Sequence, residues 1–300
     1  MIKATKCFAK LSIGRRLTVP AARQSMYTTS APRVAVLYQE LDPPLINGVR
    51  KPKKPGGYID SSADIAHALT HQHHSPITVV TPVSTPDPRN DADWCFGDSE
   101  AGVTRALEKG ATHLWANTIL FAEHPLQTAD SLTSVAEKLM IVGQPPKLVE
   151  QCDDKAFVNN LLRARGGFTL PYSHDVHDEE DLAAVLRADL RYPVVAKPVR
   201  GRGSHGVRVC RSEEELIEHC RDLLGEDAYV IVEDFLAGQE VTVTNMTGPG
   251  RPGRENQASL TALAAAGLGW DYPTLLLKIL ESSSSLRDLR NATPSHVDRK

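Results

Sequence analysis

A glycine-rich stretch at residues 200–206 is the first place where residue types and spacing could do chemistry. Gly201, Gly203 and Gly206 permit a tight turn whose backbone N–H groups can face phosphate oxygens. Lys197 stands just before this turn, at the end of an apolar run, where an ammonium group can meet phosphate as a point charge. A glycine-rich turn alone is weak evidence, because many antiparallel hairpins contain one.

Two common phosphate-binding motifs do not fit this stretch. A Walker A loop needs a Gly-Lys-Ser/Thr ending, which is absent here. A Rossmann dinucleotide fingerprint needs a helix directly after its glycines, whereas residues 207–210 read as a strand. A Rossmann-type dinucleotide binder is therefore the weakest of the hypotheses for this region.

Three further charged residues flank elements that would bring them near the glycine-rich turn. Lys155 lies in the first turn of a predicted helix, Glu233 follows the apolar run 229–232, and Glu240 lies seven residues later. Each one alone is typical of a solvated surface side chain. It is the order of these residues along the chain, together with Lys197 and the glycine-rich turn, that indicates a common binding site.

The second half of the chain reads as a mixture of strands and helices. A helix capped by Asp153 or Asp154 ends at Gly166-Gly167, and Asp178 begins another. Ser212 and Glu215 form a capping box for a third helix. Strands are expected at residues 193–196, 207–210, 229–232 and 239–244.

The first half predicts a different architecture. Apolar runs at residues 33–38, 77–80, 112–115 and 141–142 alternate with helical segments at 60–69 and from Asp98, as helix cap, to Gly110. Alternating strands and helices imply a parallel sheet covered on both faces. We therefore expect an α/β domain over residues 31–146.

Taken in order, the motifs of the second half resemble the ATP-grasp superfamily, in its D-alanine–D-alanine ligase-like branch. The motifs are Asp-Lys at a helix start, Val-Val-Ala-Lys-Pro, the glycine/serine loop, and Val-Glu-Asp-Phe-Leu-x-Gly-x-Glu, and the match covers residues 153–244. The resemblance implies a Rossmann-like N-terminal α/β domain followed by an α+β ATP-grasp domain. The nucleotide-binding part would occupy residues 147–244, and residues 245–300 would be a remnant of its C-terminal portion.

The resemblance assigns a role to each matching position. Lys155 and Lys197 would touch the ATP phosphates, and Glu233 would accept a hydrogen bond from the adenine amino group. The remaining expected contacts are Ser204 and the amides around Gly203 and Gly206 over the β- and γ-phosphates, backbone groups of Asp234 and Leu236 beside adenine, and Glu240 at the ribose.

The activity implied by the family is ATP-dependent carboxylate–amine ligation through an acyl phosphate, with Mg²⁺ neutralising the phosphates. The late strands that carry the family's metal ligands are missing from the sequence. Residues 245–253 resemble the loop that follows those strands, and residues 257–282 resemble the closing helix. We expect a long internal deletion near Thr244–Asn245, as in an exon-skipped isoform or a faulty gene model. No metal ligand and no catalytic residue can be assigned.

The substrates and the activity of this form remain open. Gln39–Pro44 replaces the family segment that positions the first alanine, so the acid and the amine are unidentified. The alternative function is that of a non-catalytic nucleotide-binding or regulatory protein. His71, His73 and His74 lack a carboxylate partner and are read as a polar loop rather than a metal site.

The amino terminus differs from the rest of the chain. Residues 1–30 contain six basic side chains and no acidic ones, which is typical of a mitochondrial transit peptide, although a cytoplasmic leader is the alternative. Subtracting those six charges from the net charge of −3 leaves −9 on the remainder. The net charge offers no basic surface for nucleic acid, and no apolar run approaches the roughly 18 residues of a membrane span, so neither nucleic acid nor a membrane is expected as a partner. The family resemblance is compatible with a homodimer.

Overall fold

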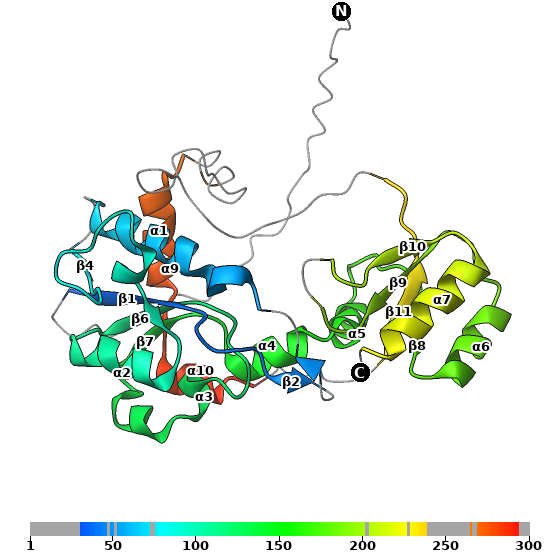
Figure 1. The fold of residues 1–300 in the computed structure, drawn as a ribbon, viewed down its shortest axis with the longest axis horizontal. Coiled ribbons are helices and arrows are strands. Elements are labelled where there is room, and N and C mark those ends of the chain that lie inside the picture. The colour runs from blue at the N-terminus through cyan, green and yellow to red at the C-terminus, as the bar shows by residue number, and fades with distance from the viewer. Residues whose placement is uncertain are drawn as a thin grey trace, which may run out of the picture. The chain divides into compact units, whose positions relative to one another are not determined.

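A computed structural model describes residues 31–46, 49–50, 53–72, 76–201, 204–226, 229–238, 265 and 269–293. The predicted leader at residues 1–30 and the predicted strand at 239–244 lie outside the described residues. Two main sheets, built from different parts of the chain, organise the described portion (Figure 1).

The first sheet has the strand order β12-β7-β6-β1-β4, with β5 also paired to β1. All its pairings are parallel except that of β12 with β7. Its central strand β1 pairs with β6 through five residue pairs, from Val34–His113 to Tyr38–Asn117. The strands are β1 (Arg33–Tyr38), β4 (Thr78–Val79), β5 (Phe96–Gly97), β6 (His113–Asn117), β7 (Met140–Val142) and β12 (Ser284–Ser285). A small hairpin of β2 (Leu45–Ile46) and β3 (Val49–Arg50) stands apart from it.

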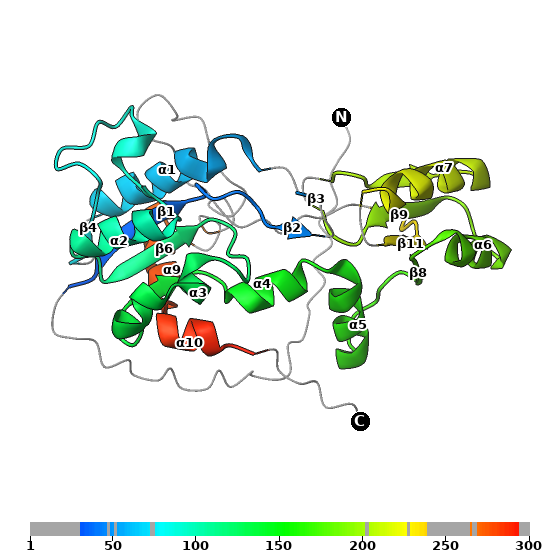
Figure 2. The ribbon, with the colours of Figure 1, turned by 60° about the horizontal axis from the view of Figure 1, so that its bottom comes forward.

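Both faces of the first sheet are buried, and successive side chains of each strand point to opposite faces. Ala35 and Leu37 of β1 face one core cluster, whereas Val34 and Val36 face the other. Helices α2 (Glu100–Glu108), α3 (Pro125–Thr128) and α10 (Leu286–Asn291) contribute to the first cluster. Helices α1 (Ile59–Thr70) and α9 (Tyr272–Glu281) contribute to the second. In Figure 2, strands β1 and β6 lie between α1 on one side and α3 and α10 on the other. This confirms the expected N-terminal α/β architecture.

The carboxy-terminal helix corrects one sequence-based expectation. The family resemblance assigned residues 257–282 to the closing helix of the ATP-grasp domain, in a remnant of its C-terminal portion. Instead, Leu275, Leu276 and Leu280 are buried in the core that includes Val34 and Val36. Helix α9 lies beside α1 (Figure 1), and β12 extends the sheet by pairing with β7. The burial of an apolar helix face against an available core explains the difference.

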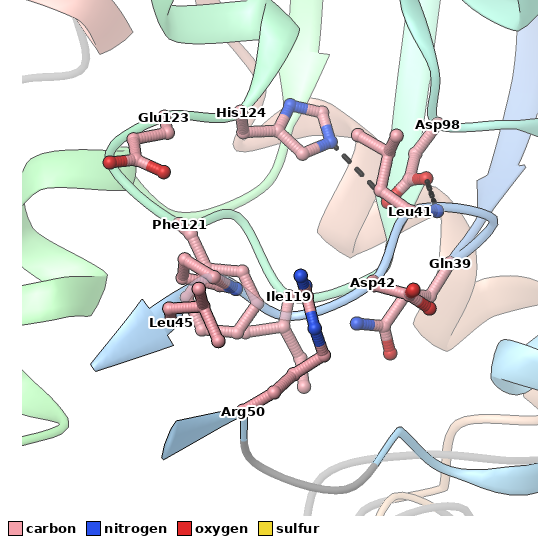
Figure 3. Close-up of a pocket in the computed structure, with 11 residues that line it drawn as sticks. Gln39, Leu41, Asp42, Leu45, Arg50, Asp98, Ile119, Phe121, Glu123 and His124 are labelled. Atoms are coloured by element: carbon pink, nitrogen blue, oxygen red, sulfur yellow. Dashed lines mark hydrogen bonds and ion pairs between the residues drawn. The ribbon is translucent and has the colours of Figure 1, made fainter. Parts of the chain in front are cut away.

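Asp98 provides a second correction, because it does not cap helix α2. Ser99 is the cap, and its hydroxyl accepts a hydrogen bond from the Gly102 amide at 3.2 Å. Asp98 is instead 1% exposed and accepts hydrogen bonds from the backbone amides of Glu40 and Leu41, both at 2.9 Å. The Asp98 carboxylate, one residue before the cap, accepts backbone N–H groups as a capping side chain would, but it stabilises the loop after β1 instead of a helix end (Figure 3).

The second sheet is antiparallel throughout and has the order β10-β9-β11-β8. Its strands are β8 (Ser173–Val176), β9 (Val194–Pro198), β10 (Arg208–Cys210) and β11 (Val230–Asp234). Helices α6 (Glu179–Arg187) and α7 (Glu213–Leu224) pack on one of its faces, with Leu182, Leu216 and Cys220 in the shared core. Asp178 and Ser212 cap these helices as predicted, although Glu215 accepts from the Arg211 amide rather than from Ser212.

Helix α5 (Lys155–Arg165) follows α4 (Pro146–Cys152) and belongs to the opposite face of the second sheet. Asp154 is its N-cap and Gly166 its C-cap, as the sequence predicts. Only Ala156 of this helix is buried, and it packs with Val199 and Ile231. Short 3₁₀ turns at Pro55–Tyr58, Asp91–Asp93 and Asp130–Val135 complete the described elements.

Candidate functional site

Strand alternation in β9 and β11 places two of the predicted site residues on one face of the second sheet. Lys197 lies opposite Ile231, and Glu233 lies opposite Val195. These four residues therefore share a face, whereas Val194, Ala196, Val230 and Val232 point into the core under α6 and α7. The predicted phosphate-binding lysine and the predicted adenine-binding carboxylate are thus brought together.

Lys197 and Glu233 form an ion pair in which the ammonium group donates a hydrogen bond to Oε1 of the carboxylate. Their side chains are 18% and 12% exposed, so most of each is screened from water. Removing either partner would leave a charge poorly solvated, which is costly in such surroundings. In the absence of a ligand, the two groups therefore neutralise each other.

Lys155 reaches the same end of β9 from the start of helix α5. Its amide donates to the Val199 carbonyl at 3.1 Å. Its ammonium group donates to the carbonyls of Pro198 and Val199, both at 3.3 Å, and to that of Gly201 at 3.4 Å. Lys155 thus fixes the chain that leads into the glycine-rich turn, and its charge lies where the sequence predicted a phosphate contact.

The position of helix α5 depends on a network that the sequence did not reveal. The Tyr229 hydroxyl donates to the Asp154 carboxylate at 3.2 Å, and that carboxylate also accepts from the Phe157 amide at 2.8 Å. Arg200 lies 3.8 Å from the same carboxylate. Burial, followed by the negative charge of Asp154, raises the pKa of Tyr229 to about 12, so the phenol remains a neutral donor.

The described part of the glycine-rich turn is held against helix α7. Ser204 is exposed with a φ of 60°, and its carbonyl accepts from the Val207 amide at 3.1 Å. The His219 ring donates through Nε2 to the Gly206 carbonyl at 2.9 Å. The serine hydroxyl therefore faces solvent at the tip of the turn. Gly203 lies outside the described residues.

The segment after β11 leaves a backbone group exposed. The Asp234 amide donates to the Tyr172 carbonyl at 3.0 Å and is already used within the sheet. Leu236 is 67% exposed, and its amide has no partner among the described residues. That amide is therefore available to a ligand edge. Glu240, the predicted ribose contact, lies outside the described residues.

Together these groups suit a ligand with an anionic end and an edge that carries a hydrogen-bond donor. The Lys155 ammonium group lies at the end of β9 that carries Lys197, where both could hold phosphate oxygens, and a carboxylate and a free amide lie along the neighbouring strand. Among the described residues, no group of three His, Cys, Asp or Glu side chains could hold a metal ion. His71 stacks on His67 at 4.1 Å, and His73 and His74 are not among the described residues.

Comparisons with known proteins relate part of the second half of the chain to one family. Residues 167–258 match the family model described as D-ala D-ala ligase C-terminus. The chain is 31% identical to the D-alanine–D-alanine ligase of Aquifex aeolicus over 33% of its length, and this covers 33% of that protein. The chain is a relative of the ATP-grasp ligases.

Other comparisons extend over different shares of the chain. The 2-oxoglutarate carboxylase small subunit of Hydrogenobacter thermophilus is 28% identical over 43% of this chain and 27% of that protein. The structure of D-alanine–D-alanine ligase from Bacillus anthracis has a TM-score of 0.47 at 17% identity, covering 69% of this chain and 58% of that one. The chain spans about a quarter to a third of the curated relatives it matches.

The predicted fold class, an N-terminal α/β domain followed by an ATP-grasp domain, is confirmed by the two sheets and the family-model match. The expected internal deletion near Thr244–Asn245 stays a prediction, since that junction lies outside the described residues. In the described part of the chain, no helix is both long enough and apolar enough to cross a bilayer.

Proposed function

We propose that this chain binds ATP on the face of the second sheet that carries Lys197 and Glu233. Two observations support this: the ion pair between Lys197 and Glu233 across β9 and β11, and the contact of the Lys155 ammonium group with the carbonyls that directly follow Lys197. Phosphate would take the ammonium group of Lys197 away from Glu233, and the adenine amino group would then satisfy the released carboxylate. The exposed amide of Leu236 would donate to a ring nitrogen.

We further propose that the complete protein ligates a carboxylate to an amine. The carboxylate oxygen attacks the γ-phosphorus, and the bond between the γ-phosphorus and its bridging oxygen breaks to give an acyl phosphate and ADP. The amine then attacks the acyl carbon, and phosphate leaves as the amine loses a proton. Lysine charge near the phosphates would favour the first step by neutralising the charge of the transferred group.

Magnesium fits this site only in part. Mg²⁺ prefers octahedral oxygen ligands, usually one or two carboxylates together with phosphates and water. The described residues offer no carboxylate cluster of that kind, so no step can be assigned to a protein-bound ion. Catalysis by this chain would therefore depend on ligands outside the described residues.

A Lys197→Ala variant tests the nucleotide assignment. Loss of a charged hydrogen bond to phosphate should cost roughly 1.5–3 kcal/mol, so the ATP dissociation constant should rise more than about tenfold. Lys138→Ala, which removes an exposed lysine of the first sheet's region, is the matched control and should leave affinity unchanged. Calorimetric titration of the full chain measures both.

Because Lys197→Ala leaves Glu233 without its partner, a second variant separates binding from folding. Lys197→Met combined with Glu233→Gln removes both charges together and should fold, as monitored by circular dichroism. Its ATP affinity should still be low. Unchanged affinity in either variant would contradict the assignment.

The alternative function is that of a non-catalytic nucleotide-binding protein. What supports it is that the described residues include the Lys197–Glu233 pair proposed for binding. ATP binding without ADP release over a panel of acids and amines would support the alternative. ADP release that depends on an acid would support ligation.

A further inference from the structure

Tyr229 stands directly before strand β11, on the sheet face that carries Glu233. Its backbone continues the sheet, because its carbonyl accepts a hydrogen bond from the Val199 amide at 3.2 Å. Its ring packs against the small apolar cluster that includes Ala156 of helix α5, and the ring centroid lies 4.5 Å from that of His177. These contacts fix the ring, so the phenol hydroxyl points in one direction, toward the start of helix α5.

The Asp154 carboxylate joins three parts of this region. The Tyr229 hydroxyl lies 3.2 Å from Oδ1 and 3.3 Å from Oδ2. Oδ1 also accepts from the Phe157 amide as the cap of helix α5, and the Arg200 guanidinium lies 3.8 Å from Oδ2. The Asp154 side chain is 18% exposed, so groups of the protein supply most of its donors. The carboxylate therefore ties the start of α5 to the start of β11 and to the glycine-rich turn.

Helix α5 has little apolar packing to hold its first turn in place. Ala156 is the only buried residue of this helix, and Phe157 is 38% exposed. Two polar contacts hold the turn instead, namely the Asp154 cap and the hydrogen bond from the Lys155 amide to the Val199 carbonyl at 3.1 Å. Weakening the cap would therefore loosen the turn that carries Lys155.

The ammonium group of Lys155 is the part of this turn that would meet phosphate. It donates to the carbonyls of Pro198, Val199 and Gly201 at distances of 3.3, 3.3 and 3.4 Å. Each distance is longer than is usual for a hydrogen bond from a charged N–H group, so these carbonyls hold the ammonium group only weakly. The place of this charge therefore depends on how firmly the helix start is held.

We propose that Tyr229 is a positioning residue for phosphate binding, which acts through Asp154 and the first turn of α5 on the Lys155 ammonium group. This inference rests on the ATP site proposed above and adds a residue that touches neither phosphate nor base. Tyr229 would determine how well the site holds the phosphate part of the nucleotide, whereas Glu233, four residues later, would hold the base.

A double-mutant cycle tests whether Tyr229 acts through Lys155. Calorimetric titration of the full chain measures ATP binding in Tyr229→Phe, in Lys155→Met and in the double variant. Tyr229→Phe keeps the ring but removes the hydroxyl, and it should raise the ATP dissociation constant about three- to tenfold. Lys155→Met should raise it more than about tenfold. The double variant should bind like Lys155→Met alone, because the hydroxyl then has no ammonium group to position.

Asp154 allows a rescue by a conservative substitution. Asparagine caps helices about as well as aspartate and can accept from the Tyr229 hydroxyl, whereas alanine can do neither. Both substitutions remove the charge, so Asp154→Asn should bind ATP at least about threefold more tightly than Asp154→Ala. Tyr192→Phe is the matched control, because it removes a phenol hydroxyl from the opposite face of the same sheet and should leave ATP affinity unchanged. Circular dichroism checks that each variant folds.

Three results would overturn the proposal. They are unchanged ATP affinity in Tyr229→Phe, an equal loss from this substitution with and without Lys155→Met, and equal affinity of Asp154→Asn and Asp154→Ala. Absence of ATP binding by the wild type would refute the proposed function and this inference together. ATP binding that Lys197→Ala weakens and Tyr229→Phe does not would refute this inference alone.

Discussion

Gly206 has a φ of +69°, and a Cβ atom at this position would lie 2.8 Å from Leu223 Cδ2 and 3.0 Å from Pro198 Cδ. The glycine is therefore required for the turn to approach helix α7, independently of any phosphate. Sequence alone assigned this residue to ligand binding, because a glycine needed for packing and one needed for phosphate contact look the same. The two roles can coexist, since packing fixes the end of the turn that a ligand would use.

Replacing Gly206 with alanine should destabilise the second sheet. The left-handed backbone costs roughly 1–2 kcal/mol for an alanine, and the contact with Leu223 adds roughly 1–3 kcal/mol. Gly167→Ala is the control, because Gly167 also has a positive φ, of +80°, but a methyl group at that position would have nothing within 4 Å. Urea denaturation should show the larger loss in Gly206→Ala, and equal losses would contradict the packing role.

The buried Asp98 should make stability depend on acid in a defined direction. Burial acts to raise its pKa, but hydrogen bonds from His124, Thr118 and the Leu41 amide outweigh burial and place the pKa below the ordinary value of 3.8. A depressed carboxyl pKa contributes stability that is present above the unfolded-state value and is lost as pH falls through the folded-state value.

Asp98→Asn should therefore be less stable than the wild type at neutral pH, and the difference should shrink as the pH falls below 3.8. Urea denaturation of both proteins over a pH series measures this difference, and the exposed Glu108→Gln variant is the control for general titration. A difference that stays constant or grows in acid would show that the Asp98 carboxylate is not stabilised by its donors.

At the scale of elements, apolar periodicity predicted most of what the structure contains. The central strand β1, the helices capped by Asp154, Asp178 and Ser212, and the strands that carry Lys197 and Glu233 all lie where the sequence indicated. These are local signals of caps and alternation. The two-residue strand β12 has no such signal, because its pairing with β7 joins residues far apart in the chain.

Helix α9 offers a direct test of the corrected carboxy-terminal region. Leu276 is fully buried in the core of the first sheet, so Leu276→Ala should cost about 2–5 kcal/mol of unfolding free energy. Lys278→Ala, on the exposed face of the same helix, should cost little. Amide hydrogen exchange should show faster exchange in α1 as well as α9 for the leucine variant. Equal effects of the two substitutions would mean that the helix is not part of this core.

The candidate site was predictable only where a residue's role follows from its own strand or helix. Lys155 and Lys197 were found because each stands at the end of a recognisable element. The Asp154–Tyr229 contact and the Asp98–His124 pair were missed, because they join residues 75 and 26 positions apart through tertiary packing. No spacing rule predicts contacts of that kind, and the Asp154–Tyr229 contact helps to position the helix that begins with Lys155.

At the scale of the whole molecule, the hydrophobic clusters of the described residues divide between the two sheets. Each sheet therefore has its own core, and the proposed nucleotide site lies on the second sheet. The proposed ligation needs, besides its substrates, metal-assisted charge neutralisation of the transferred phosphoryl group. The described part of the chain offers no cluster of three His, Cys, Asp or Glu side chains for such a metal ion.

We therefore expect this chain to bind nucleotide but to release ADP at a negligible rate in the presence of Mg²⁺ and mixed amino acids. Positioning and charge neutralisation supply nearly all catalysis in phosphoryl transfer, so the loss should be several orders of magnitude. A coupled ADP assay measures the rate, and ATP titration of the same sample shows whether binding persists. Rapid release that depends on an amino acid would show that metal ligands exist outside the described residues.

Under the proposed function, the ion pair between Lys197 and Glu233 should make the site selective for whole nucleotides. Inorganic phosphate alone would pair with Lys197 and leave the Glu233 carboxylate without a partner. A free nucleobase would bind Glu233 and leave the Lys197 ammonium group without a partner. Each half-ligand therefore opposes its own binding, because it leaves one mostly buried charge uncompensated. A molecule with both a phosphate group and a nucleobase gives each of the two charges a new partner, so its two ends should bind cooperatively. Abundant cellular phosphate should therefore be a poor competitor.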